Sequence, residues 1–189
     1  MLVKARLSLT KTHLPRTGVA DPELTVVDDT YWQGRKDLEY YRTVHRLAAR
    51  HCPDGTSLLD VGGGVGLGCR YLEWFGEFTR TSVETPTRDC ILDGVRVVHS
   101  DFADWERDCE YDLVLCLQVL EHIPDAESFA RKIFESGRVV IISVPYMWKS
   151  GVCSEHVHDP VNEEKLQGWT GRSPTESCRV DSRLVAVFA

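Results

Sequence analysis

The chain alternates short, almost continuously apolar runs with longer segments in which apolar residues recur every three or four positions. Runs such as LLDV, DLVLCL and VVIISV are typical of strands buried on both faces of a sheet. The longer spacing is typical of amphipathic helices. The pattern predicts strands at residues 57–61, 81–84, 95–99, 111–116 and 138–144, and helices at residues 31–50, 65–75, 125–135 and 162–169.

Strands that alternate with helices form crossover units, and such units build an α/β fold around a mostly parallel sheet. Two more strands are predicted near the C-terminus, at 177–180 and 183–188, with a hairpin turn at Asp181 and Ser182. A further strand is predicted at 3–9. We expect a single domain over residues 1–189, with an N-terminal strand and helix cap in 1–55 and the ligand-binding core in 56–189.

Composition narrows the class of partner. With 189 residues and 42% apolar content, the chain is long enough for one hydrophobic core. Its net charge of −7 is poorly suited to a nucleic-acid partner. No apolar run approaches the roughly 20 residues that a membrane-spanning helix needs. The seven cysteines form no CxxC pair, and several lie in apolar runs, which indicates buried thiols in a reducing, cytoplasmic compartment.

A glycine-rich loop follows the first strand of this core, in the order Asp60-Val61-Gly62-Gly63-Gly64-Val65-Gly66. Glycines at such a place allow a tight turn and let a ligand approach the backbone without meeting a Cβ. The following helix would offer free N–H groups at its start. The dinucleotide pattern GxGxxG fails here, because its sixth position is Leu67. An NAD-dependent oxidoreductase is therefore disfavoured.

The remaining pattern, D-x-G-x-G-x-G, resembles the signature loop of class I S-adenosylmethionine (SAM)-dependent methyltransferases. Residues 111–124, YDLVLCLQVLEHIP, resemble a segment of their small-molecule members. The resemblance covers roughly residues 56–189 and implies a three-layer Rossmann-like sheet, mostly parallel with an antiparallel C-terminal strand. It also implies SAM as cofactor, bound by the following residues: Asp60, Gly62, Gly64, Gly66, Glu84, Asp101, Phe102 and Leu117.

Each of these residues has a specific expected role. Glu84, at the end of the second strand, would accept hydrogen bonds from the ribose hydroxyls. The resemblance implies that Asp101 accepts from the adenine amine and that Phe102 packs on the adenine ring. It also implies that Leu117 and Gln118 flank the methionyl part of SAM. Only ten residues separate Glu84 from Val95, which predicts a short or missing helix and an open adenine side.

Two histidines are the candidate catalytic residues. Methyl transfer needs alignment of the acceptor and, for some acceptors, removal of a proton. His122 follows the fourth strand and His156 follows the fifth, so both are expected at the ligand-binding edge of the sheet. Each also has a structural alternative, because His122 would equally pack under a crossover and His156 would equally anchor a loop.

A metal is the open question at these histidines. Some ubiquinone-pathway O-methyltransferases and small-RNA 2′-O-methyltransferases bind a divalent metal through E-x-x-E-H, and the chain resembles this motif at Gln118, Glu121 and His122. His156 or His158 would supply a further ligand. Because Gln118 replaces the first glutamate, and an amide is a poorer ligand for a hard cation, we assign no metal site from the sequence.

The motifs together imply a SAM-dependent methyltransferase that acts on the oxygen or nitrogen of a small molecule. One alternative enlarges the acceptor to a protein or RNA. Another is a non-catalytic SAM-binding module that serves as a sensor or subunit. We expect a cytoplasmic protein with no membrane partner. The predicted strand at 3–9 would pair within the chain or with a second copy, which leaves a homodimer open.

Overall fold

The computed structural model describes residues 38–63, 79–84 and 95–189. Several sequence predictions fall outside these ranges: the strand at 3–9, the first part of the helix at 31–50, the helix at 65–75, and the segment between Glu84 and Val95. Gly64 and Gly66 lie outside them as well.

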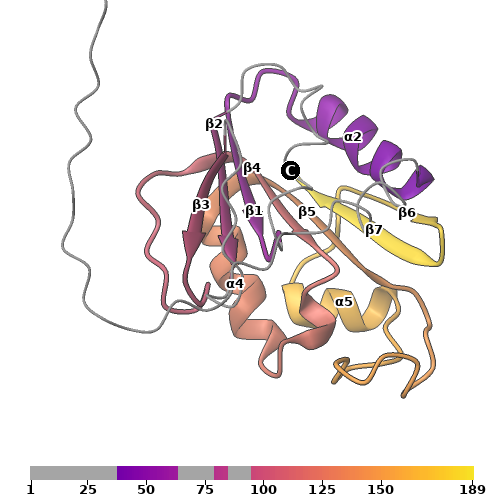
Figure 1. Cartoon of the computed structure of the whole chain (residues 1–189). Helices are drawn as coiled ribbons and strands as arrows, with labels where there is room; N and C mark the ends of the chain where they lie inside the picture. The colour runs from indigo at the N-terminus through magenta and orange to yellow at the C-terminus, as the bar shows by residue number, and fades with distance from the viewer. Residues whose placement is uncertain (1–37, 64–78, 85–94) are drawn as a thin grey trace, which may run out of the picture.

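The described residues are built around a seven-stranded sheet in the order β3-β2-β1-β4-β5-β7-β6 (Figure 1). The strands are β1 (Ser57–Val61), β2 (Thr79–Glu84), β3 (Val95–His99), β4 (Tyr111–Leu117), β5 (Gly137–Pro145), β6 (Glu176–Val180) and β7 (Arg183–Phe188). β1 to β5 pair in parallel, whereas β7 is antiparallel to both of its neighbours. The predicted α/β sheet, mostly parallel with an antiparallel C-terminal strand, is confirmed.

The hairpin between β6 and β7 depends on its two turn residues. Asp181 and Ser182 both have positive φ angles, 46° and 58°. Two consecutive left-handed residues make the turn whose twist matches that of paired strands. The Asp181 carboxylate also accepts the backbone N–H of Tyr40 at 2.8 Å. The predicted hairpin turn is therefore confirmed, and it anchors the start of the helix on that face.

Helices cover both faces of the sheet (Figure 1). On one face lies α2 (Glu39–His51), and on the other lie α4 (Ala126–Ser136) and α5 (Glu163–Thr170). Each of the last two begins at a side chain that accepts a backbone N–H of the first turn, Asp125 before α4 and Asn162 before α5. No described helix is long and apolar enough to cross a membrane.

Alternation along the strands divides the core into two clusters. Leu58, Leu113 and Val139 stand side by side on neighbouring strands and belong to the cluster under α2. The next residue of each strand points the opposite way, into the cluster under α4 and α5. The central strands are therefore buried on both faces, which explains their almost continuously apolar sequence.

This arrangement brings the carboxyl ends of β1, β4 and β5 to one edge of the sheet. Right-handed crossovers place ligands outside this edge in open α/β folds. The loops after the three strands carry the glycine turn, the short 3-10 helix η2 (Leu120–His122) and the segment 146–162. The candidate catalytic residues His122 and His156 are on the last two of these loops.

Candidate functional site

The turn after β1 requires a glycine at position 62 for two reasons. Gly62 has a φ of +71°, in the left-handed region that favours glycine. A Cβ at this position would lie 2.5 Å from Cγ2 of Val119, far inside contact distance. The N–H of Gly62 donates to the carbonyl of Val83 at 2.9 Å. The turn is therefore packed directly against the loop after β4.

The end of β4 is held by a chain of buried hydroxyls. Gln118 takes a left-handed φ of 60°, and its backbone N–H donates to the carbonyl of Ser143 at 2.9 Å. Its side-chain amide donates to Ser143 Oγ at 3.1 Å. The hydroxyl of Tyr40 pairs with the same Oγ at 2.8 Å. These bonds fix the loop that leads from Leu117 to η2, and they direct the Gln118 amide nitrogen toward the sheet.

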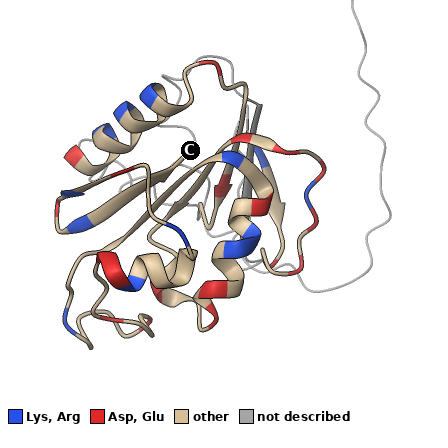
Figure 2. Ribbon diagram, turned by 180° about the vertical axis from the view of Figure 1, so that it is seen from behind, with Lys and Arg blue, Asp and Glu red and all other residues tan. Residues whose placement is uncertain are grey.

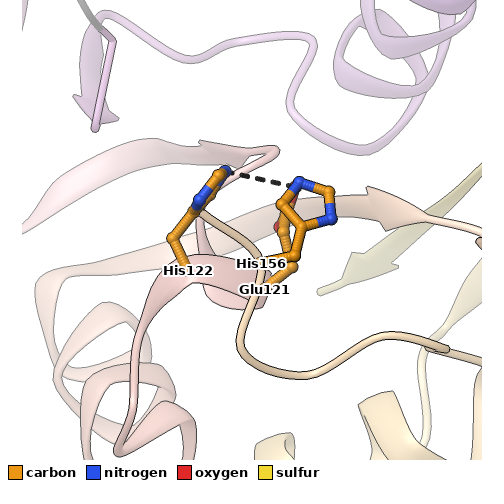
Figure 3. A group of neighbouring side chains, drawn as sticks. All are labelled: Glu121, His122 and His156. Atoms are coloured by element: carbon orange, nitrogen blue, oxygen red, sulfur yellow. Dashed lines mark ion pairs between the residues drawn. The ribbon is translucent and has the colours of Figure 1, made fainter. Parts of the chain in front are cut away.

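Three side chains converge just beyond this point. Glu121 and His122 belong to η2, and His156 comes from the loop after β5 (Figure 3). One ligand-capable atom of each lies within 4.8 Å of those of the other two. His122 Nε2 is 4.0 Å from Glu121 Oε1, and the two imidazole rings meet edge to face at 4.7 Å between centroids. The sequence placed both histidines at this edge, and the structure brings them into contact.

Hydrogen bonds orient both imidazoles. His122 Nδ1 lies 3.2 Å from the carbonyl oxygen of Glu155, and His156 Nδ1 lies 2.8 Å from Oδ2 of Asp159. A carbonyl and a carboxylate only accept, so in both rings the proton is on Nδ1. The lone pair of each neutral ring is therefore on Nε2. The backbone also joins the two loops, because Val157 N–H donates to the Glu121 carbonyl at 3.0 Å.

Glu121 is a buried carboxyl group without a hydrogen-bonding partner. Its side chain is 1% exposed, and neither carboxyl oxygen has a hydrogen-bond partner among the described residues. Burial raises its pKa to about 8, and the nearby charge of Asp159 acts in the same direction. Asp159 resembles it, with a side chain 1% exposed and an Oδ1 that no described group binds. Burial of such polar groups costs free energy unless a bonding partner offsets it.

An aromatic side chain packs on this cluster, and apolar side chains of the same loop are exposed. The indole of Trp148 stacks on the His156 ring, with centroids 5.7 Å apart. Three large apolar side chains of the same segment are exposed instead of buried: Met147, Val152 and Val157. Exposed apolar groups beside convergent polar ones are typical of ligand sites. The loop that carries His156 therefore has a partly apolar surface.

A family model described as a methyltransferase domain matches residues 31–184. The chain belongs to this methyltransferase family. No protein of curated function shows significant sequence similarity to it. The predicted family and enzyme class are confirmed by this match.

Solved structures share the fold of this methyltransferase. The 1,6-didemethyltoxoflavin-N1-methyltransferase of Burkholderia thailandensis, with its substrate and S-adenosylhomocysteine bound, is 20% identical; the match covers 84% of this chain and 83% of that one, with a TM-score of 0.60. A methyltransferase in complex with the Haloferax volcanii Trm112 activator is 16% identical; the match covers 84% of this chain and 94% of that one, with a TM-score of 0.61. A Streptoalloteichus sugar N-methyltransferase is 23% identical; the match covers 76% of this chain and 63% of that one, with a TM-score of 0.51.

The other candidate residues of the methyltransferase occupy the same edge. Asp60 is buried at the end of β1. Glu84 is the last residue of β2 and pairs in register with His99 of β3. Asp101 follows β3 and is exposed, with Oδ1 accepting the N–H of Ala103 at 2.8 Å. Their roles toward SAM stay predictions.

Two of the predicted residues have surroundings that bear on their expected roles. Phe102 is 4% exposed and packs between Trp105 and Phe129 in the core, so most of its ring is already covered. Leu117 is partly buried at the end of β4. The roles of both in SAM binding stay predictions.

Three residues of the site were not assigned from the sequence. Ser143 is the one hydroxyl in the apolar run VVIISV, which is a usable signal for a buried polar link. Asp159 stands three residues after His156, and that spacing is compatible with a side-chain pair in a turn. Tyr40 carries no such signal, because its partner is far away in sequence. His158 is not in the cluster; its Nε2 donates to the carbonyl of Ile123 at 2.8 Å.

Proposed function

We propose that the protein transfers the methyl group of SAM to an oxygen or nitrogen atom of a small molecule. The main support for this proposal is a contact between two loops at one edge of the sheet. The glycine turn after β1 packs on Val119, and Val119 directly precedes η2, which carries Glu121 and His122. A cofactor at the turn and an acceptor at the histidines would therefore be neighbours, as transfer requires.

The described residues fit SAM as the cofactor. Gly62 leaves the turn without a side chain where a ligand would approach, and Asp60 is the next-to-last residue of the strand before it. Oδ2 of Asp101 has no hydrogen-bond partner among the described residues, and this exposed oxygen is suited to accept from an amine. We propose that these three bind the cofactor together with the remaining predicted set: Gly64, Gly66, Glu84, Phe102 and Leu117.

We propose His122 as the residue that meets the acceptor and His156 as the residue that positions its ring. His122 is 32% exposed, so an acceptor reaches its ring, whereas His156 is 5% exposed behind it. Trp148 and the exposed Met147, Val152 and Val157 offer apolar surface for the body of the acceptor. The site thus combines a polar centre with apolar surroundings.

Charge supports a small acceptor over a nucleic acid. The net charge is −7, and basic and acidic residues are interspersed over the described helices and strands (Figure 2). A phosphate backbone needs a concentration of basic side chains instead. The toxoflavin and sugar methyltransferases to which the chain is similar are named for small acceptors. A single domain over 1–189, a cytoplasmic location and a homodimer stay predictions.

Tritium-labelled SAM separates the proposal from its rivals. The protein is incubated with methyl-labelled SAM and a cell extract divided into low-molecular-mass, protein and RNA fractions. We expect label in the low-molecular-mass fraction, with loss of transfer in His122→Gln and retention in His51→Gln, a histidine paired with Glu176 far from this edge. Label in protein or RNA would assign a macromolecular acceptor. SAM binding with no label in any fraction would assign a non-catalytic module.

A further inference from the structure

We propose that Glu121, His122 and His156 form a binding site for a divalent first-row transition ion. These side chains come from two loops at the carboxyl edge of the sheet and converge on one point (Figure 3). The proposal concerns metal binding alone, so its test does not depend on which acceptor the enzyme methylates.

The first argument is the direction of the lone pairs. Both Nδ1 atoms donate to groups that only accept, the Glu155 carbonyl and the Asp159 carboxylate. Both Nε2 atoms are therefore left with lone pairs, and that of His122 is 4.0 Å from Glu121 Oε1. Metal-binding histidines are oriented in this way, with the second ring nitrogen bonded to a carboxylate or a backbone carbonyl.

The second argument is the buried carboxyl group itself. Glu121 is 1% exposed, and both of its oxygens lack a hydrogen-bond donor among the described residues. Behind His156, Asp159 is also 1% exposed with one oxygen unpartnered. Both oxygens of Glu121 and Oδ1 of Asp159 are therefore buried without a donor among the described residues. A cation held by Glu121 and the two imidazoles would offset the burial of the Glu121 carboxyl group.

A free catalytic base would not account for this arrangement. A base needs one accessible imidazole and one group that orients it. Here two imidazoles face the same buried carboxyl group, and His156 is 5% exposed, which leaves little room for an acceptor to reach it. Three converging acceptors are explained by a ligand set, whereas one of them would be enough for proton removal.

The donor set indicates the kind of ion. Two imidazole nitrogens and one carboxylate oxygen suit Zn²⁺, Co²⁺, Mn²⁺ or Fe²⁺, whereas Mg²⁺ and Ca²⁺ prefer oxygen ligands. Ligand atoms around a tetrahedral ion are about 3.3 Å apart. The present separations of up to 4.8 Å would close by side-chain rotation of an ångström or so. Three protein ligands leave a further position, and His122, 32% exposed, marks its solvent side.

The test is binding to the full chain, without any methyl acceptor. Purified, chelator-treated protein is titrated with Zn²⁺, Mn²⁺ and Mg²⁺ by calorimetry, and with Co²⁺ by visible absorption. We expect one equivalent of Zn²⁺ or Co²⁺, with Co²⁺ bands of nitrogen and oxygen ligation, and at least tenfold weaker binding of Mg²⁺. Absence of both heat and bands overturns the proposal. So does a Co²⁺ thiolate charge-transfer band, because it would place the ion at a cysteine.

Variants locate the ion. Glu121→Gln keeps the size of the side chain but removes the anionic ligand, and affinity should fall on the order of 100-fold or more. Affinity should fall as far in His122→Gln. Because Asp159 orients the His156 ring, affinity should fall by about tenfold to 100-fold in Asp159→Asn. His51→Gln and His158→Gln should bind as the unaltered protein does. Unchanged affinity in Glu121→Gln or His122→Gln overturns the assignment.

The stability of the metal-free variants shows whether a loss of metal affinity results from misfolding. Glu121→Gln replaces a buried, unpaired carboxyl group with a neutral amide, so its unfolding midpoint without metal should equal or exceed that of the unaltered protein. Added Zn²⁺ should raise the midpoint of the unaltered protein and leave that of Glu121→Gln unchanged. Equal Zn²⁺ stabilisation of both proteins would place the ion elsewhere.

Discussion

Alanine at position 62 tests the packing of the glycine turn against Val119. Two costs apply at once. A non-glycine residue at a φ of +71° costs about 1–2 kcal/mol. The new Cβ would meet Val119 Cγ2 at 2.5 Å, whereas unstrained carbon atoms are about 3.5–4 Å apart. Forcing such a side chain aside costs about 1–3 kcal/mol. Gly62→Ala should therefore lower the free energy of unfolding by about 2–5 kcal/mol.

Two other glycines separate these costs. Gly171, at the end of α5, has a similar φ of +64° but nothing within 4 Å of an added Cβ. Gly171→Ala should therefore show the conformational cost alone, about 1–2 kcal/mol. Gly168, inside α5, has neither a positive φ nor a close neighbour, and Gly168→Ala should stabilise by about 0.5–1 kcal/mol.

Urea unfolding of the three variants gives their order, and a double-mutant cycle isolates the clash. Gly62→Ala combined with Val119→Ala should recover about 1–3 kcal/mol relative to the sum of the single changes, because the contact has been removed. Affinity for S-adenosylhomocysteine, measured on the same proteins, should fall at least tenfold in Gly62→Ala and stay unchanged in Gly171→Ala. Equal destabilisation by Gly62→Ala and Gly171→Ala, with no coupling to Val119, would refute the reasoning.

Ser143→Ala should destabilise by about 1–3 kcal/mol in urea, because the buried hydroxyl of Tyr40 loses its partner; Ser136→Ala, which gives up one bond to a helix carbonyl, should lose less. Asn162→Ala should cost about 1 kcal/mol in thermal unfolding, because α5 loses its cap. A hydrogen bond from the Thr56 backbone N–H, and after it one from Arg138, hold the pKa of the Asp112 carboxyl group well below its ordinary value. The stabilisation is therefore present above about pH 4 and lost as pH falls toward the folded pKa, so Asp112→Asn should flatten the dependence of Tm on pH between 4 and 2.

The central strands β1, β4 and β5 were predictable because their burial is two-sided. β1, β3 and β7 have the bounds that the apolar runs and the turn residues predicted. β4 and β5 each extend one residue further at their carboxyl ends than predicted: Leu117 pairs with Ser143, and Pro145 with Arg183. Such pairing depends on neighbours that a local pattern does not contain.

The site was predictable in its residue types and not in its contacts. That His122 and His156 lie at the ligand-binding edge followed from the strand order. The choice between His156 and His158 did not, because neighbouring positions of a loop carry no periodicity. In the structure Asp159 holds the His156 ring beside Glu121, whereas the Ile123 carbonyl binds His158.

Val119 explains why the two halves of the edge depend on each other. Its side chain fills the space that a Cβ of Gly62 would need, and its carbonyl accepts the N–H of His122 at 2.9 Å. The residue before it, Gln118, is fixed in a left-handed conformation by Ser143. The loop after β4 is therefore held on both sides. A shift of the glycine turn reaches η2 through the side chain of Val119, so the position of Glu121 and His122 depends on that turn.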